Sequence, residues 1–112
     1  MTELVDRKCV PCEGGIPPLT PAECQKYHAK LAPDWTLSAD FKFLSRAFAF
    51  KDFYRTMSFV NALAHIANIE DHHPDLEVGY NYCRVRFNTH AIDGLSDNDF
   101  IRAAKVDLIA LT

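Results

Sequence analysis

The sequence of 112 residues predicts an α+β domain, with helices packed on one face of a four-stranded antiparallel sheet. Two observations favour this class. Short segments with apolar residues at strand spacing occur in two neighbouring pairs, as is typical of hairpins. Helical signals, either capping motifs or apolar residues every three or four positions, precede, separate and follow those pairs. The expected order is therefore helix, two strands, helix, two strands, helix.

The first half of the chain contains one expected helix and one expected strand pair. A helix is expected over residues 20–31, because Thr20 and Glu23 have the spacing of a capping box and a proline follows Thr20. Residues 35–37 and 41–50 carry large apolar residues at strand spacing. We expect these two segments to pair as a hairpin.

The second half of the chain contains a long helix, a second strand pair and a last helix. The long helix is expected over residues 51–71, and the strands over 76–80 and 83–89. The expected apolar face of the long helix consists of Phe53, Met57, Phe59, Val60, Leu63, Ala64, Ile66 and Ala67. The last helix begins near Ser96, and its expected apolar side consists of Phe100, Ala103, Ala104 and Leu108.

Composition indicates one globular unit. Hydrophobic residues make up 48% and aromatic residues 12%, and a chain of this length suits a single core. Residues 1–19 contain three prolines and two glycines, which disfavour regular structure. We expect an N-terminal arm over residues 1–19, rich in Cys, Pro and Gly, and one folded domain over residues 20–112.

The charge pattern argues against several classes of partner. The net charge is -3 and no basic stripe occurs, so direct binding to nucleic acid is not expected. No segment has the length and apolar character of a membrane span, and charged residues interrupt the N-terminal residues where a signal peptide would be apolar. The expected location is the cytoplasm.

Three of the five histidines belong to one spaced pattern. The pattern consists of His72, His73, Pro74, Tyr80, His90 and Asp99. Histidine changes its charge near physiological pH and is therefore suited to moving protons. A proline cannot continue a helix, so the paired histidines are expected where the long helix ends, and His90 where a strand ends.

A polar stripe precedes these histidines on the long helix. Asn61, His65, Asn68 and His72 follow one another at steps of four, three and four residues. For Asn61 and His65, the solvent-exposed side of an amphipathic helix is the simpler interpretation.

The run from Asp71 to Tyr80, followed by Asn88-Thr89-His90 and Gly94-Leu95-Ser96, resembles the pterin-4a-carbinolamine dehydratase family. The resemblance covers residues 20–111 and is to the bacterial type, with the N-terminal arm as an extension. It implies the same α+β fold. It also implies the family's reaction, which is loss of water from 4a-hydroxytetrahydropterin to give a quinonoid dihydropterin.

The resemblance also implies roles for particular residues. His72 and His90 would be the acid/base pair and His73 would orient or share protons, whereas the sequence leaves open which histidine is the acid. The implied substrate-binding residues are Trp35, Asp71, His72, His73, Asn88, Thr89, His90 and Ala91. The implied supporting residues are Asn68, Pro74, Tyr80 and Asp99. No metal or other cofactor is expected, because the pterin is the substrate.

Three of these residues have a second interpretation. Trp35 could equally be a core or surface aromatic on a short strand. Asp99 could cap the last helix together with Ser96, and this role is compatible with one at the site. Asn68 stands where the family commonly has an acidic residue, and an amide cannot stabilise an imidazolium by charge.

The four cysteines raise the possibility of a metal site. Cys9, Cys12, Cys24 and His28 could in principle bind zinc, and His65, His72 and His90 are a second conceivable ligand set. Free thiols are the simpler interpretation, because no second pair of cysteines with the spacing of Cys9 and Cys12 occurs.

The resemblance implies partners as well as chemistry. A homodimer or homotetramer is expected, and an edge strand over residues 76–80 could pair across a two-fold axis. An aromatic amino acid hydroxylase is the implied metabolic partner, since the dehydratase would recycle its pterin. The competing hypothesis is a non-catalytic dimerisation or assembly cofactor of the same fold.

Overall fold

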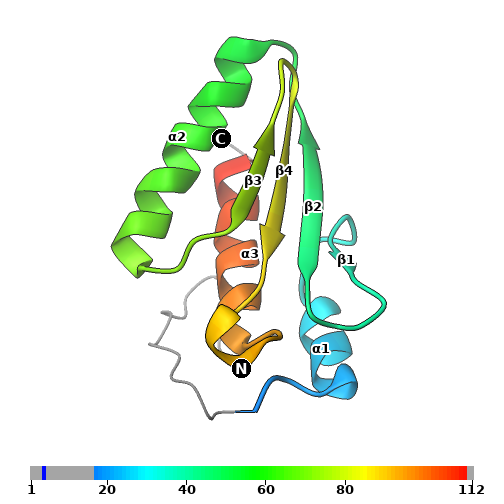
Figure 1. The fold of residues 1–112 in the computed structure, drawn as a ribbon. Coiled ribbons are helices and arrows are strands. Elements are labelled where there is room, and N and C mark those ends of the chain that lie inside the picture. The colour runs from blue at the N-terminus through cyan, green and yellow to red at the C-terminus, as the bar shows by residue number, and fades with distance from the viewer. Residues whose placement is uncertain (1–3, 5–16, 111–112) are drawn as a thin grey trace.

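The computed structural model describes residue 4 and residues 17–110, and its fold is the α+β class that the sequence predicts (Figure 1). The elements in chain order are α1 (Pro21–His28), β1 (Thr36–Leu37), β2 (Leu44–Ala49), α2 (Phe53–Glu70), β3 (Asp75–Val78), β4 (Tyr82–Phe87), the 3-10 helix η2 (His90–Ile92) and α3 (Asp97–Ala110). Of the predicted N-terminal arm, residues 1–3 and 5–16 lie outside the described part.

The four strands form one antiparallel sheet in the order β1-β2-β4-β3, so both predicted hairpins are confirmed. The two central strands, β2 and β4, come from different hairpins. Leu44 at the start of β2 pairs with Phe87 at the end of β4. This pairing brings the loop before β2 next to the segment that follows β4, which carries His90.

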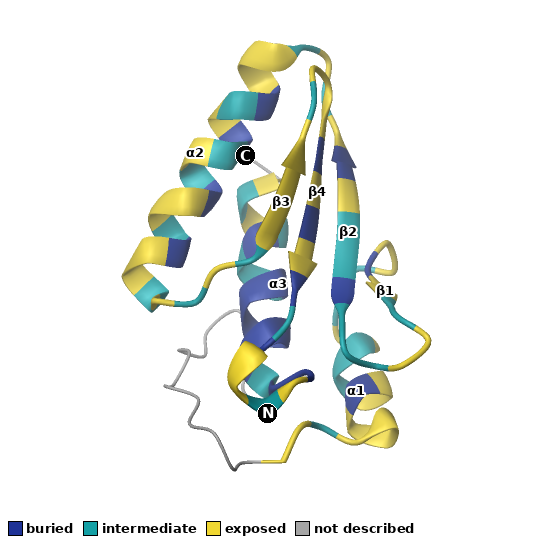
Figure 2. Cartoon of the chain, viewed as in Figure 1, coloured by how far each residue is buried: buried dark blue, intermediate teal, exposed yellow. Residues whose placement is uncertain are grey.

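Helices α2 and α3 cover one face of the sheet, and α1 packs against α3 (Figure 1). Figure 2 shows the result on β4, where buried Cys83, Val85 and Phe87 alternate with exposed residues. The core between the sheet and helices includes Leu44, Phe48, Phe59, Leu63, Phe87, Leu95, Phe100, Ile101 and Val106. None of the helices in the described part of the chain is long and apolar enough to cross a bilayer.

Two element boundaries differ from the predicted ones by three residues, whereas the other helix and strand boundaries differ by less. Helix α1 has the expected capping box but ends at His28, because the N–H groups of Lys30 and Leu31 bond three residues back, as in a tightened last turn. Strand β2 begins at Leu44, since Phe41 lies in the left-handed region at φ 58° and belongs to a turn.

The buried faces of the long helices match the predicted ones only in part. Phe59, Leu63 and Ala67 on α2 and Phe100 and Ala103 on α3 are buried as predicted. On α2 the buried residues are Thr56, Phe59, Leu63 and Ala67, whereas Phe53 is exposed. Thr56 can be buried because its hydroxyl lies 2.9 and 3.0 Å from two backbone carbonyl oxygens. On α3 the prediction for Leu108 is wrong in the same way, since its side chain is exposed and the neighbouring buried position is Val106 instead. The predicted face on α2 is likewise wrong for Ala64, which is exposed.

Candidate active site

The paired histidines lie where α2 ends, as predicted. Glu70 is the last helical residue, and Asp71 caps the helix in the left-handed conformation, with φ 53° and ψ 43°. The backbone N–H groups of Asp71 and His72 both donate to the carbonyl oxygen of Ala67. Pro74 then leads directly into β3, so the position of His72 is fixed by the end of one element and the start of the next.

A buried carboxylate holds His72. Its Nε2 lies 2.9 Å from Oδ1 of Asp99 on α3, and the Asp99 side chain is 0% exposed. The other oxygen, Oδ2, accepts hydrogen bonds from the Thr89 hydroxyl at 2.7 Å and from the Ser96 backbone N–H at 3.0 Å. The Thr89 and Ser96 hydroxyl oxygens are 2.9 Å apart. We call these four residues, His72, Thr89, Ser96 and Asp99, the Asp99 network.

Asp99 performs both functions that the sequence left open for it. Its carboxylate accepts from the Ser96 N–H, and its own N–H donates to the Ser96 carbonyl at 3.1 Å, as expected at the start of α3. The same carboxylate holds His72. The helix cap therefore also orients a candidate catalytic side chain.

Aromatic rings connect His72 to the core. The ring centroids of His72 and Phe87 are 6.2 Å apart at an interplanar angle of 8°, and those of Trp35 and Phe87 are 6.0 Å apart at 40°. Trp35 is 1% exposed, and its indole N–H donates to Asp107 at 2.9 Å. Trp35 thus occupies a core position, the second of its two interpretations, and one ring separates it from His72.

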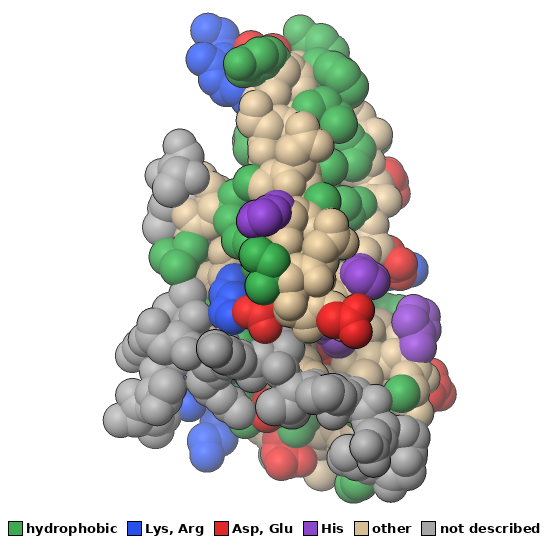
Figure 3. Space-filling view, turned by 90° about the vertical axis from the view of Figure 1, so that its left-hand side faces the viewer, with side chains coloured by type: hydrophobic (Ala, Val, Ile, Leu, Met, Phe, Trp, Pro, Cys, Tyr) green, Lys and Arg blue, Asp and Glu red, His purple; other side chains and the backbone are tan. Residues whose placement is uncertain are grey.

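The other candidate residues of this region are exposed. His73 follows His72, and His90 and Ala91 lie in η2, a turn that the sequence analysis did not anticipate. Backbone hydrogen bonds between Thr89 and Gly94 close this turn. Figure 3 shows several histidine side chains near one another on this side of the molecule, with acidic side chains beside them.

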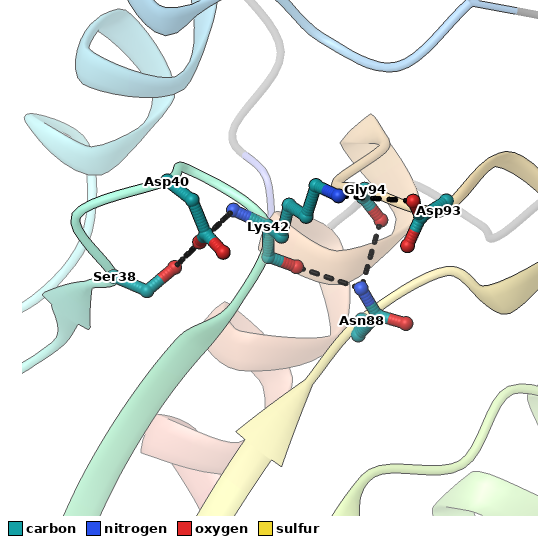
Figure 4. Close-up of polar contacts among 6 residues, drawn as sticks. All are labelled: Ser38, Asp40, Lys42, Asn88, Asp93 and Gly94. Atoms are coloured by element: carbon teal, nitrogen blue, oxygen red, sulfur yellow. Dashed lines mark hydrogen bonds and ion pairs between the residues drawn. The ribbon is translucent and has the colours of Figure 1, made fainter.

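Asn88 points toward the protein backbone. Its Nδ2 donates to the carbonyl oxygen of Lys42 at 2.7 Å and lies 3.4 Å from that of Gly94 (Figure 4). Lys42 in turn donates from Nζ to Asp93 at 2.9 Å, and this ion pair raises the pKa of the Lys42 ammonium. The amide of Asn88 therefore joins the loop before β2 to the turn that carries His90.

Two supporting residues lie away from the Asp99 network. Tyr80 is 65% exposed in the turn between β3 and β4, and its carbonyl oxygen bonds Thr56 in the first turn of α2, at the opposite end of that helix from His72. Asn68 is exposed on α2, as is His65. Within one chain, the structure therefore does not bring Tyr80 to the paired histidines.

The acid that contacts His72 comes from α3. Glu70, one of the two acidic residues close in sequence to the histidines, instead pairs with Lys105 and lies 3.9 Å from Arg102. Since Asn68 is exposed and carries no charge, Asp99 supplies the carboxylate at the imidazole.

The described cysteines are buried free thiols. Burial raises the pKa of both Cys24 and Cys83. Cys9 and Cys12 lie outside the described residues, so the zinc hypothesis is not tested there. Across residue 4 and residues 17–110, no three His, Cys, Asp or Glu side chains are grouped as metal ligands.

A broad depression on the other face of the sheet is separate from these residues. Its lining includes Thr36, Ser45, Ala47, Arg84 and Arg86, and it contains none of the candidate histidines. The arginines pair with acidic residues of β3, Arg84 with Glu77 and Arg86 with Asp75.

Sequence analysis missed two residues that contact His72 or its partner. Phe87 lies beside the imidazole, and its burial could have been inferred from the alternation along β4. Ser96 was expected as a motif residue and as the capping partner of Asp99 but not as a hydrogen-bond partner of Thr89 at the site, although a capping residue so close to a candidate acid is a usable signal. Together, the residues provide one imidazole that a carboxylate orients, His72, and two exposed imidazoles, His73 and His90.

Comparisons with known proteins identify the family of the chain. The sequence model of the family described as pterin 4 alpha carbinolamine dehydratase matches residues 17–109. A protein from Nitrosomonas europaea is 58% identical over 107 residues, which cover 96% of this chain and 93% of that protein. A protein from Legionella pneumophila is 53% identical over 106 residues, covering 95% and 94%. Both are named "Putative pterin-4-alpha-carbinolamine dehydratase".

Two solved structures share the fold. A transcriptional coactivator/pterin dehydratase from Brucella melitensis has a TM-score of 0.78 and 31% identity, over 83% of this chain and 98% of that one. A pterin dehydratase-like RuBisCO assembly factor of the alpha-carboxysome has a TM-score of 0.61 and 24% identity, over 69% and 89%, and this likeness concerns the fold alone. The family match and the curated relatives cover nearly the whole chain, and the protein belongs to the pterin-4a-carbinolamine dehydratase family.

Proposed function

We propose that the protein removes water from 4a-hydroxytetrahydropterin to give a quinonoid dihydropterin, with histidines as general acid and general base. The observation that carries the proposal is the Asp99 network, which joins His72 at the end of α2 to Thr89, the residue before His90. Family membership supports the substrate class. The pathway we propose for this activity is the recycling of tetrahydrobiopterin.

The reaction requires two proton transfers that imidazoles can perform. The bond between C4a and the hydroxyl oxygen breaks as an acid protonates the hydroxyl, which leaves as water. A base removes the proton of a ring nitrogen, and its electrons form the new double bond. His72 and His90 are the proposed pair and exposed His73 a proton-sharing neighbour, because such groups work best with a pKa near the working pH. Neither a metal nor a cofactor takes part in this proposal.

The direct test is ultraviolet-monitored dehydration of freshly generated 4a-hydroxytetrahydropterin. We expect the protein to accelerate the reaction with or without a chelator, and His72→Ala or His90→Ala to lower kcat about 10²- to 10⁴-fold. His65→Ala is the matched control, since His65 is exposed on the same helix and outside the Asp99 network. No acceleration by the wild-type protein above the spontaneous rate would refute the proposal.

The alternative function is a non-catalytic dimerisation or assembly cofactor. The described relatives include a coactivator and a RuBisCO assembly factor, and this chain has Asn68 where the family commonly has an acid. A catalytically silent wild-type protein that nevertheless binds a partner protein would favour this function, and Asn68→Glu would then be the first variant to assay for gained turnover.

We also propose that the protein is a homodimer or homotetramer in the cytoplasm and serves an aromatic amino acid hydroxylase. All four residues of the edge strand β3 are exposed, including apolar Leu76 and Val78, and such an edge can pair with a second copy across a two-fold axis. Light scattering should give at least twice the monomer mass of 12.7 kDa. Leu76→Lys should shift the protein toward monomer. An oligomer of unchanged mass in this variant would exclude β3 as the contact between copies.

A further inference from the structure

We propose that Thr89 is a positioning residue rather than a substrate contact, and that it sets which nitrogen of His72 is presented to the substrate. The resemblance to the family placed Thr89 among the substrate-binding residues. In the structure its side chain is turned inward and the residue is 4% exposed. Both polar contacts of its hydroxyl are to protein atoms, Oδ2 of Asp99 and Oγ of Ser96.

Counting the protons assigns a direction to the hydrogen bonds that Thr89 and Asp99 make with side chains of the Asp99 network. A hydroxyl has one proton, and that of Thr89 is donated to Oδ2 of Asp99 at 2.7 Å. The 2.9 Å contact between the two hydroxyls must therefore use the proton of Ser96, so Ser96 donates to Thr89. The backbone N–H of Ser96 is a second donor to Oδ2, at 3.0 Å.

The same count fixes the tautomer of His72. An ionised carboxylate has no proton to give, so Oδ1 of Asp99 can only accept at the 2.9 Å contact, and Nε2 of His72 must be the donor. The neutral ring then carries its proton on Nε2 and its lone pair on Nδ1. Because Asp99 engages Nε2, Nδ1 is the nitrogen left to exchange a proton with a ligand, and neutral His72 can act there only as the base.

Thr89 contributes by holding the carboxylate in one rotamer. Its hydroxyl and the Ser96 N–H both bind Oδ2, which leaves Oδ1 directed at the imidazole. Without the hydroxyl, Asp99 would keep one donor on Oδ2 and could rotate away from His72. The effect on catalysis would reach the substrate only through His72, as expected of an oriented histidine and its carboxylate.

The test compares Thr89→Val, which removes the hydroxyl at nearly constant volume, with Thr89→Ser, which retains it. We expect Thr89→Val to lower kcat about tenfold, to leave KM within twofold and to shift the acidic limb of the kcat profile against pH. Thr89→Ser should restore at least half of the lost turnover. A raised KM with unchanged kcat in Thr89→Val would show that the hydroxyl binds substrate and would overturn the inference.

A second readout does not depend on the proposed function. Nitrogen-15 shifts of the His72 ring in the wild-type protein should show a protonated Nε2 and an unprotonated Nδ1, and Thr89→Val should increase the fraction of the other tautomer. Asp99→Asn is the sharper variant, because its amide can donate to Nε2 and so invert the tautomer. A wild-type ring with its proton on Nδ1 would refute the assignment, even if the protein is no dehydratase.

Discussion

Two aspartates on α3, about two helical turns apart, each hold a ring nitrogen of a residue from elsewhere in the chain. Asp99 accepts from the imidazole of His72, and Asp107 accepts from the indole of Trp35. The Asp99 side chain is 0% exposed and its neighbours are a histidine and two hydroxyl-bearing residues. The Asp107 side chain is 19% exposed and also pairs with the cation of Arg46 at 2.7 Å.

The difference between the two aspartates lies in what their partners can do. An indole N–H does not titrate and an arginine stays charged at any physiological pH, so the Asp107 cluster can only fix structure. An imidazole gains and loses a proton near neutral pH, so the Asp99 network can take part in chemistry. The same residue type on the same helix therefore acquires a structural or a chemical function from its partner.

The largest expected effect comes from removing each carboxylate. Asp99→Ala should lower kcat of the proposed dehydration about 10- to 100-fold, because His72 loses its orienting acceptor. Asp107→Ala should leave kcat within about threefold while lowering the free energy of unfolding, because Trp35 and Arg46 lose a half-buried acceptor. Turnover and urea midpoints of both variants measure these effects. If Asp107→Ala loses as much activity as Asp99→Ala, the distinction between a chemical and a structural aspartate is contradicted.

A smaller effect is expected from removing the cation of the Asp107 cluster. Arg46→Met should lower the free energy of unfolding by about 1–3 kcal/mol, since the half-buried Asp107 carboxylate keeps its charge but loses its nearest cation. Adding Asp107→Asn to that variant should recover part of the loss. Equilibrium urea unfolding gives both values, and a double variant no more stable than Arg46→Met would argue against an electrostatic origin.

The smallest expected effect is a dependence on pH. Burial raises the pKa of Asp107, even though Trp35 and Arg46 donate hydrogen bonds that oppose the shift. A carboxyl group with a raised pKa in the folded state binds its proton more tightly there than in the unfolded chain, so its contribution to stability is complete below its ordinary pKa of 3.8. That contribution declines as the pH rises through the folded-state value.

Asp107→Asn provides the reference for this prediction, because an amide does not titrate. The free energy of unfolding of the wild-type protein minus that of the variant should decrease as the pH rises from about 3.8. Urea midpoints at half-unit intervals would measure the trend. A difference that increases with pH would mean that Arg46 lowers the pKa of Asp107 by more than burial raises it.

Local signals predicted most of the fold. The capping box at Thr20, the proline after the paired histidines and the alternation along β4 each depend on a few neighbouring residues, and each indicated the correct element. The buried faces of α2 and α3 were predicted less well. Thr56 is buried because two carbonyl oxygens satisfy its hydroxyl, and one of these belongs to Tyr80, far away in sequence.

The candidate site could be predicted as a set of residues but not as a geometry. Spacing placed His72 at a helix end and identified Asp99, yet nothing in the spacing indicated that the two side chains meet. The side chains of Asn88 and Thr89 turn inward because backbone and carboxylate acceptors from other segments lie there. Such directions depend on tertiary contacts, which a single sequence does not list.

The two buried thiols allow local opening of the folded protein to be measured by cysteine alkylation. Cys83 on β4 pairs with Phe48 on β2, the two central strands of the sheet, and Cys24 is buried on α1. An alkylating reagent can reach the first only when β2 and β4 separate or the helices lift, and the second only when α1 detaches. With Cys9 and Cys12 replaced by serine, the alkylation rate of Cys83 would show how often its part of the core opens under native conditions. The rate of Cys24 would show how often α1 detaches.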